Sequence, residues 1–279
     1  MTAPAFVRDG RGLTGIAILL IAGALAVAAP LVARDAPPSD VVRTRFLPPL
    51  ATDVHGTFHP LGTDRLGRDV WARLVYGARV SLGVGLLAVL ISVLLGVAVG
   101  AIAGYWPGLL GTALLAATDF ALALPRVVLL LLLAALWQPS AWLVVVVLGL
   151  TGWMPVARLV HGEVAALAVR PFVDGAAALG ATGRRILWRH VLPNALTPVI
   201  VAAALGVGNA ILLEAGLSFL GLGVQPPTPS WGAMIASGRD TIVNAPWVAA
   251  APGAFLVLVV VACTLLGDAL RDALDPRSR

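Results

Sequence analysis

The chain is 279 residues long; 59% of its residues are hydrophobic and 12% are charged, and its mean hydropathy is +0.94. Soluble globular domains are far more polar, so this composition excludes them and predicts an integral membrane protein. The isoelectric point near 10.9 does not indicate nucleic acid as a partner, because the cationic residues, all arginine, lie in short segments between apolar runs, where they set membrane topology.

In chain order, six apolar stretches are long enough to cross a bilayer as a helix, which takes about 20 residues. The first follows Arg8 and Arg11 and ends in small residues, so it also imitates a signal peptide. Because this stretch is long enough to span, we expect it to be retained as a helix. The sequence thus predicts an all-α membrane protein of about six transmembrane helices, near residues 13–33, 79–103, 111–136, 140–159, 195–217 and 247–267.

The arginines also predict the side of the membrane that each loop faces. With the N-terminus inside, six spans place residues 160–194 and the C-terminal tail in the cytoplasm, where their arginines are favoured. The loop over residues 34–78 must then lie outside, although its arginines alternate with aspartates. A folded loop of this length crosses the membrane largely regardless of charge, so we keep this orientation.

Residues 160–194 combine small residues, glycine and a basic cluster. Pro171 suits the first turn of a helix, and Asp174 complements the positive end of the helix dipole. Gly180 can take the left-handed conformation that ends a helix, and Thr182 can cap the next one. We therefore expect two short helices joined at a glycine corner.

The first of these helices is predicted over Pro171–Leu179, and Pro193 is predicted to stop the second helix near the membrane. The first helix has almost no side-chain bulk, which suits a segment that enters a groove on another protein. The alternative is an amphipathic helix on the lipid surface, which Trp188 and the arginines would also fit.

Seven residues of this segment occur in a characteristic order: Asp174, Gly175, Ala176, Gly180, His190, Leu192 and Pro193. The order resembles the EAA loop of ABC-importer permeases, which has Glu-Ala-Ala, a glycine at the same offset and a closing Leu-Pro. The chain differs in having aspartate for glutamate and glycine for the first alanine. The glycine destabilises the helix by about 1 kcal/mol relative to alanine.

The resemblance covers nearly the whole chain and narrows the subfamily. Residues 59–85, 119–125, 189–198, 214–235 and 265–277 are similar to the dipeptide, oligopeptide and nickel permease group, and specifically to its C-type subunit. Before the last match this chain has Cys263-Thr264, where the family commonly has an asparagine.

The resemblance implies a type I ABC-importer permease bundle with a cytoplasmic coupling helix, in a bacterial inner membrane. Residues 1–78 would form the first helix and an extracytoplasmic loop, and residues 79–279 the permease domain with its coupling loop 160–194. The substrate would be a peptide or a related small solute such as nickel or haem. The coupling residues would be Pro171, Asp174, Gly175, Ala176, Ala177, Gly180, Arg184, Arg185, His190, Leu192 and Pro193.

The same resemblance implies several partners besides membrane lipid. These are a homologous B-type permease, one or two ATP-binding subunits and an extracytoplasmic substrate-binding protein. The chain has no lysine, so it cannot supply the Gly-Lys-Ser/Thr of a P-loop. We therefore expect no catalysis and no cofactor in this chain, with ATP and magnesium bound in the partner subunits.

Two other kinds of site are disfavoured. His55 and His59 have the spacing of a helical metal pair, but Gly56 and Pro60 predict a loop and no third ligand is evident. A Ser-His-Asp hydrolase lacks its nucleophile elbow here. Cys263 is the only cysteine, which excludes a disulfide within the chain.

Asp119 and Glu214 are the acids expected at membrane depth, where an ionisable group must face water, a partner or the bundle interior. Each is a candidate for the translocation path. The alternatives are that they lock helices together, or that Glu214 lies hydrated near the outer surface. Arg126 lies two turns beyond Asp119, too far for contact within one helix but within reach of another acid.

Two other function classes remain open at this stage. An ion- or proton-driven secondary transporter would use Asp119 and Glu214 as relay groups, but it leaves the basic cytoplasmic segment without a role. A structural membrane subunit would conduct nothing.

The segment after the fifth span is too polar and too rich in proline to cross the membrane. Ser230 can cap a short helix that carries Trp231, Met234 and Ile235 along the membrane interface. By resemblance this outer segment helps to form the mouth that meets a substrate-binding protein. Alternatively it is a re-entrant plug or an interfacial anchor without a partner.

Overall fold

The computed structural model describes residues 10–33 and 44–274. The regular secondary structure of the described chain is helical apart from one short antiparallel hairpin, β1–β2. Its elements in chain order are α2 (Gly10–Val27), α3 (Ala29–Val32), β1 (Ala51–Thr52), β2 (Phe58–His59), α4 (Val70–Tyr105), α5 (Leu109–Ala123), α6 (Arg126–Ala135), α7 (Ala141–Ala168), α8 (Pro171–Ala178), α9 (Gly183–Ile186), the π-helix η1 (Leu187–Val191), α10 (Leu192–Ala195), α11 (Thr197–Phe219), α12 (Trp231–Gly238), the 3-10 helix η2 (Arg239–Thr241) and α13 (Trp247–Leu274).

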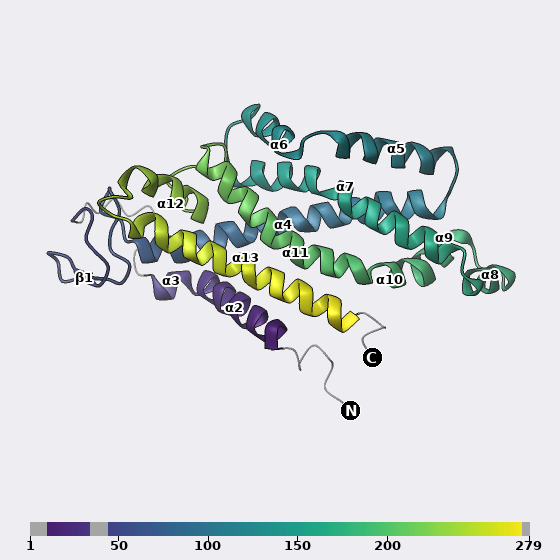
Figure 1. The fold of residues 1–279 in the computed structure, drawn as a ribbon, viewed down its shortest axis with the longest axis horizontal. Coiled ribbons are helices and arrows are strands. Elements are labelled where there is room, and N and C mark those ends of the chain that lie inside the picture. Colours follow the sequence, from purple (N-terminus) through teal and green to yellow (C-terminus); the bar gives the residue numbers. More distant parts are fainter. Residues whose placement is uncertain (1–9, 34–43, 275–279) are drawn as a thin grey trace.

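The long helices run side by side along one axis (Figure 1). The start of α2, the end of α13 and α8 point toward one end of the bundle, and the β1–β2 hairpin and α12 lie at the other. Five helices of the described chain, α2, α4, α7, α11 and α13, are long and apolar enough to cross a membrane. Together with the bent pair α5–α6 they give the six spans that the sequence predicts.

One predicted span is not a continuous helix. The sequence predicts a single helix over residues 111–136, but the chain bends by 84° between α5 and α6. Pro125 causes the break, because it lacks an N–H and forces the residue before it out of the helical conformation. Leu124 is accordingly extended, with φ −73° and ψ 134°.

The observed helix boundaries also differ from the predicted ones. Asp69 caps α4 by accepting hydrogen bonds from the backbone N–H groups of Trp71 and Ala72, so α4 begins well before residue 79. Its 36 residues extend about 54 Å, beyond a hydrocarbon core of about 30 Å. The expected domain boundary between residues 78 and 79 therefore falls inside this helix.

The central contact of the bundle is between α4 and α7. Three glycines, Gly96, Gly100 and Gly104, recur every four residues on α4 and lie directly against α7. A Cβ added at Gly104 would stand 2.8 Å from the His161 carbonyl oxygen and 3.0 Å from Val164 Cβ. Glycine at this spacing lets the two helix backbones approach closely, as is common between membrane helices.

The prediction that Pro193 stops the second cytoplasmic helix is wrong. The chain stays helical from Gly183 through η1 and α10 and, past Leu196, into α11. In η1 the Leu192 N–H donates to the Leu187 carbonyl five residues back, which is the π-helical pattern. A proline in a helix lacks one N–H donor, and this local change of pattern accommodates it without ending the helix.

The outer segment also differs in part from its prediction. Ser230 caps α12 as expected, accepting the Ala233 N–H at 3.2 Å. Trp231 and Met234, however, are 0% and 2% exposed, so they do not lie along the interface. They pack in the core with residues of α4, α11 and α13, and the Trp231 indole donates to the Leu74 carbonyl at 3.1 Å. The helix is thus an integral part of the bundle.

The first helix is packed into the bundle as well. Gly15 of α2 lies against α13, where an added Cβ would stand 2.8 Å from the Ala262 carbonyl oxygen. Cys263 is buried in the same region of α13 as a free thiol. Arg8, residues 34–43 and the tail over residues 275–279, which the sequence interpretation used for topology, lie outside the described residues.

Candidate functional site

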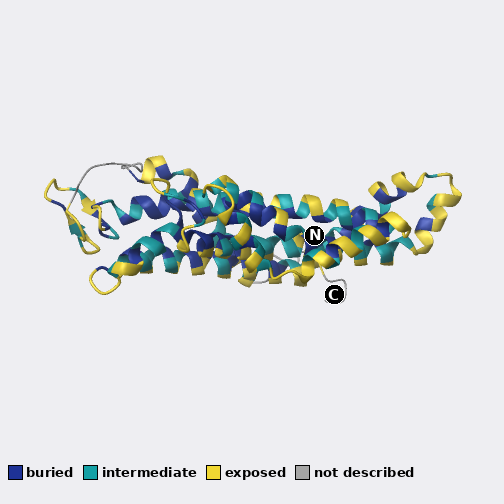
Figure 2. Ribbon diagram, turned by 90° about the horizontal axis from the view of Figure 1, so that it is seen from above, coloured by how far each residue is buried: buried dark blue, intermediate teal, exposed yellow. Residues whose placement is uncertain are grey.

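The segment α8 and the corner after it form the far tip of the molecule (Figure 1). Figure 2 shows exposed residues gathered at this tip and at the opposite loops, with buried residues along the bundle between them. Within α8 only Val173 is buried, in the same hydrophobic cluster as Val160 and Val164 of α7. Leu179, just after α8, is 91% exposed. The tip is therefore anchored on one side and presents small and apolar groups on the other.

The corner after α8 has the geometry predicted from its glycine. Gly180 has a φ of +83°, its N–H donates to the Ala177 carbonyl at 2.9 Å, and the Ala181 N–H donates to the Ala176 carbonyl at 3.1 Å. This pair of bonds is a Schellman motif, which ends a helix with a left-handed residue. Thr182 then accepts the Arg185 N–H and caps α9.

The predicted coupling residues fall into three groups by exposure. Leu192 is buried in the core, so its role is to hold the segment rather than to face a partner. Ala176 and His190 are half-buried. The exposed members are Pro171, Asp174, Gly175, Ala177, Gly180, Arg184, Arg185 and Pro193.

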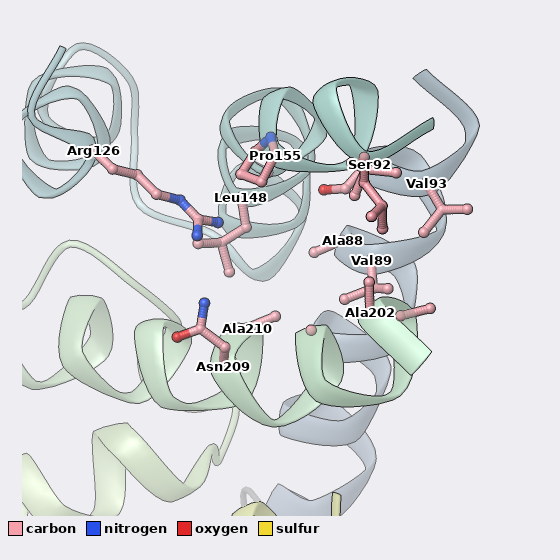
Figure 3. Close-up of a pocket in the computed structure, with 15 residues that line it drawn as sticks. Ala88, Val89, Ser92, Val93, Arg126, Leu148, Pro155, Ala202, Asn209 and Ala210 are labelled. Carbon is pink, nitrogen blue, oxygen red and sulfur yellow. The ribbon is translucent and has the colours of Figure 1, made fainter. Parts of the chain in front are cut away.

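A cavity of about 380 Å³ lies between α4, α6, α7 and α11, lined by residues from the middle of α4, α7 and α11. Its lining is mostly small and apolar, with three polar side chains: Ser92, Arg126 and Asn209. The Arg126 guanidinium and the Asn209 carboxamide point toward one another from α6 and α11 (Figure 3). Arg126 Nε is buried and has no hydrogen-bond partner within the described chain.

The outer hairpin is held by a buried cluster of acids around one histidine. His59 is 0% exposed, and its ring nitrogens lie 3.1 Å from Asp69 Oδ2 and 3.5 Å from Asp53 Oδ2. The Thr57 N–H, donating to Asp53 at 2.8 Å, is the main reason that the pKa of Asp53 is lowered from 3.8. No group of three or more acid, histidine or cysteine side chains in residues 10–33 and 44–274 could hold a metal ion.

Comparisons with known proteins decide the family. Residues 96–279 match the family described as binding-protein-dependent transport system inner membrane component. The chain belongs to this permease family. A putative peptide transport system permease protein of Brucella abortus is 39% identical over 99% of this chain and 91% of its own length. The di/tripeptide transport system permease protein DppC of Pseudomonas aeruginosa is 39% identical over 98% of this chain and 90% of its own.

A solved structure supports the fold. The chain is similar to a subunit of the MetNI methionine ABC transporter in an inward-facing conformation, with a TM-score of 0.60, 20% identity, and coverage of 73% of this chain and 96% of that one. The permease therefore has the type I ABC-importer fold that the sequence resemblance implies, and it lies as a multi-pass protein in a bacterial inner membrane.

The permease keeps its two predicted path acids apart. Asp119 on α5 pairs with Arg158 of α7 at 2.7 Å, and the two side chains are 41% and 56% exposed. Glu214 is 0% exposed and accepts hydrogen bonds from Ser81 at 2.9 Å and Ser218 at 2.7 Å. The alternative that Glu214 lies hydrated near the surface is therefore wrong.

Neither acid lines the central cavity. The family match gives no support to the secondary-transporter alternative. The polar groups that do line the cavity were missed as a set by sequence reasoning. The available signals were Pro125, which breaks the span next to Arg126, and Asn209 as an isolated amide in an apolar helix.

Proposed function

We propose that this permease is the C-type subunit of an ATP-driven importer for peptides, and that α8 couples it to an ATPase partner. The family works with ATP-binding subunits and a substrate-binding protein, and relatives that match nearly the whole chain are named as peptide permeases. The observation that carries the coupling role is the exposed, small-residue helix α8 with its left-handed corner at Gly180.

The packing around α8 explains how it would transmit motion. Two residues, Val169 and Arg170, join α7 to α8. The buried Val173 side chain ties α8 to α7 and to Ile186 of α9 in one cluster. A packed core has low compressibility and transmits displacement, so closure of an ATPase pair around α8 would tilt α7 and the helices packed on it.

The proposed assembly places the chemistry outside this chain. Two ATP-binding subunits, with ATP and magnesium, would supply the energy, and a homologous B-type permease would complete the translocation path. An extracytoplasmic binding protein would meet the outer end near α12 and the β1–β2 hairpin. ATP binding would then move the pair of permeases from inward-open to outward-open.

Substitutions at the tip test the coupling role. The Ala177→Trp variant adds bulk to the exposed face of α8, and Gly180→Val introduces a β-branched residue at positive φ, with a cost of at least about 1 kcal/mol. We expect the permease to insert and to pair with its B-type partner but to lose co-purification of the ATPase or ATP-dependent uptake of di- and tripeptides in proteoliposomes.

Matched controls separate docking from general damage. Val243 is 90% exposed at the opposite end of the molecule, so Val243→Trp introduces the same exposed indole side chain away from α8. Gly162→Ala places a Cβ in open space on α7. Both controls should keep co-purification of the ATPase. Gly162→Ala should also keep uptake, because it lies away from the outer end that is proposed to meet the binding protein. Normal ATPase co-purification and normal uptake in both tip variants would show that α8 is only a surface helix.

A further inference from the structure

The central cavity contains a cation, Arg126, for which the described residues provide no counter-ion. Arg126 is the first residue of α6 and follows directly on the break at Pro125. Its buried Nε makes no hydrogen bond within the described chain. An arginine in such apolar surroundings at membrane depth is unfavourable unless it faces water or an opposite charge. The residue therefore points to a ligand that residues 10–33 and 44–274 do not provide.

The two acids expected at membrane depth are already engaged. Asp119 pairs with Arg158, and Glu214 is held by the hydroxyl groups of Ser81 and Ser218. No residue that lines the cavity is acidic. An anionic partner for Arg126 must come from outside the described part of this chain.

The residues around the Arg126 guanidinium leave space for a ligand next to it. Gly152 lines the wall next to it, and a Cβ at that position would collide with Ser92 Oγ and stand 3.4 Å from Arg126 Nη2. Ser92 itself donates to the Gly149 carbonyl at 3.1 Å, so its hydroxyl is already engaged. The Asn209 carboxamide faces Arg126 from the opposite wall (Figure 3).

The two side chains suit a carboxylate. A guanidinium can bind both oxygens of a carboxylate in a planar fork, and a carboxamide can donate a further hydrogen bond. The cavity of about 380 Å³ is within the usual range for small-ligand sites of about 300–1,000 Å³. Asn209 is an exposed residue, so the cavity opens to the surface of the described chain.

We propose that the cavity is an anion-binding site that receives a carboxylate of the solute in transit, with Arg126 as its cationic contact and Asn209 as its second polar contact. The proposal that the cavity binds anions does not depend on which class of substrate the permease transports. Its assignment to the C-terminal carboxylate of a peptide rests on the proposed function of the permease.

The first test measures the charge preference of the cavity without any substrate. Ala203 lines the cavity, so Ala203→Cys is introduced with Cys263→Ala into the assembled importer in phosphatidylcholine vesicles. An anionic methanethiosulfonate reagent should modify this cysteine faster than a cationic one of similar size. We expect Arg126→Gln to lower the anion-to-cation rate ratio by about tenfold, because a unit charge within the cavity acts strongly on each reagent. Arg126→Lys should keep the ratio.

The control removes a different arginine. Arg239 lies at the outer end with its side chain 65% exposed, so Arg239→Gln should leave the rate ratio unchanged. An unchanged ratio in Arg126→Gln would overturn the anion site. If the preference for the anionic reagent is present in phosphatidylcholine vesicles but disappears when anionic lipid is added, lipid headgroups occupy the site. This result would also overturn the proposal.

The second test identifies the ligand. Uptake of a tripeptide is compared with uptake of the same tripeptide amidated at its C-terminus, in the wild-type importer and in Arg126→Gln. Discrimination by the binding protein affects both importers equally and cancels in the comparison. We expect Arg126→Gln to lower the acid-to-amide uptake ratio by about tenfold, as for the loss of one charge-assisted hydrogen bond, and Arg126→Lys to restore part of it.

Together the two tests distinguish a failure of the carboxylate assignment from a failure of the proposed peptide function. An equal loss of acid and amide uptake in Arg126→Gln would show a structural role and would overturn the carboxylate assignment. If the wild-type importer moves neither peptide, the proposed peptide function fails, while the reagent test still decides whether the cavity binds anions.

Discussion

Glu214 acts as a buried junction between segments far apart in the sequence. Its carboxylate accepts from Ser81 of α4 and from Ser218 on its own helix. Ser81 in turn accepts the Trp231 N–H at 3.2 Å, and Ser218 accepts the Val224 N–H at 3.0 Å. One side chain thus fixes the loop after α11 and the start of α12 on the bundle.

Substitution of Glu214 should destabilise the permease according to the hydrogen bonds that remain. The Glu214→Leu variant leaves two buried hydroxyl groups without an acceptor, at about 1–3 kcal/mol for each unsatisfied group. The Glu214→Gln variant keeps an acceptor oxygen and should lose less. Thermal unfolding of the purified complex measures the difference. Equal midpoints for the two variants would show that the hydroxyl network does not stabilise the outer end.

Asp53 should make the outer hairpin sensitive to acid. Its pKa is lowered from 3.8 chiefly by the Thr57 N–H and further by the His55 N–H, and burial opposes both. A group with a lowered pKa in the folded state stabilises that state above its unfolded pKa, and this stabilisation is lost as the pH falls through the folded value. Protection of the Thr57 amide from hydrogen exchange should hold at neutral pH and decrease below about pH 4.

The Asp53→Asn variant provides the comparison. Its amide oxygen can still accept a hydrogen bond but carries no charge, so protection should be lower at neutral pH and should change less on acidification. Hydrogen exchange followed by mass spectrometry on the intact complex gives both profiles. Parallel profiles for the two proteins would exclude Asp53 as the titrating group.

Residue-level predictions succeeded where the cause is local. The positive φ of Gly180 and the caps at Thr182 and Ser230 depend on a few neighbouring residues, and all three are confirmed. The surroundings of Arg126 and Glu214 depend instead on helices far away in the chain. Their burial and partners could not be derived from their own segments.

At the scale of elements, proline has three different effects in this chain. Pro155 lies inside α7, which stays one continuous helix. Pro193 is accommodated by the π-helical turn η1 before it. Pro125 separates α5 and α6 at an angle of 84°. Each proline removes one N–H donor, and the surrounding packing decides which result follows, so the sequence predicted the number of spans better than their continuity.

The glycine row on α4 gives a sharp test of helix packing. A Cβ at Gly100 would collide with the Ala157 carbonyl oxygen and stand 2.8 Å from Val160 Cβ. Gly100→Ala should therefore push α4 from α7 and destabilise the permease by about 1–3 kcal/mol. Gly83→Ala is the matched control on the same helix, because its Cβ meets nothing within 4 Å.

The control should be neutral or slightly stabilising, since alanine is favoured over glycine in a helix by about 1 kcal/mol. Unfolding midpoints of the two purified complexes measure both effects. Similar midpoints would mean that the α4–α7 contact relaxes freely around an added methyl group.

At the scale of the whole molecule, the proposed functions are spread along one axis. The tip at α8 lies at one end, the β1–β2 hairpin and α12 lie at the other, and the cavity at Arg126 lies between them. The α4–α7 pair connects the cavity wall to the tip, because both helices line the cavity and α7 leads into α8. A displacement of α8 therefore has a packed route to the proposed solute site.

This axis predicts the sidedness of labelling. We expect cysteines at Ala178 and Thr182 to react with a membrane-impermeant maleimide only after the inner membrane is broken. Cysteines at Thr228 and Asn244 should already react in cells whose inner membrane is intact and whose outer envelope has been made permeable to the reagent. All four positions are exposed. Ser230 is a poor probe although it lies in the same outer segment, because it is 0% exposed and caps α12.

Cys263 is replaced by alanine in every variant, so that only the introduced cysteine reacts. The orientation follows from the arginines beside α8, which favour the cytoplasm, while the hairpin with its mixed charges can be translocated as a folded loop. The coupling role of α8 requires the cytoplasmic side, because ATP is hydrolysed there. Labelling of Asn244→Cys but not of Thr182→Cys in intact cells is the expected result, with the two ends of the bundle on opposite sides of the membrane. Labelling of Thr182→Cys in intact cells would instead place α8 outside and remove it as the contact for an ATPase.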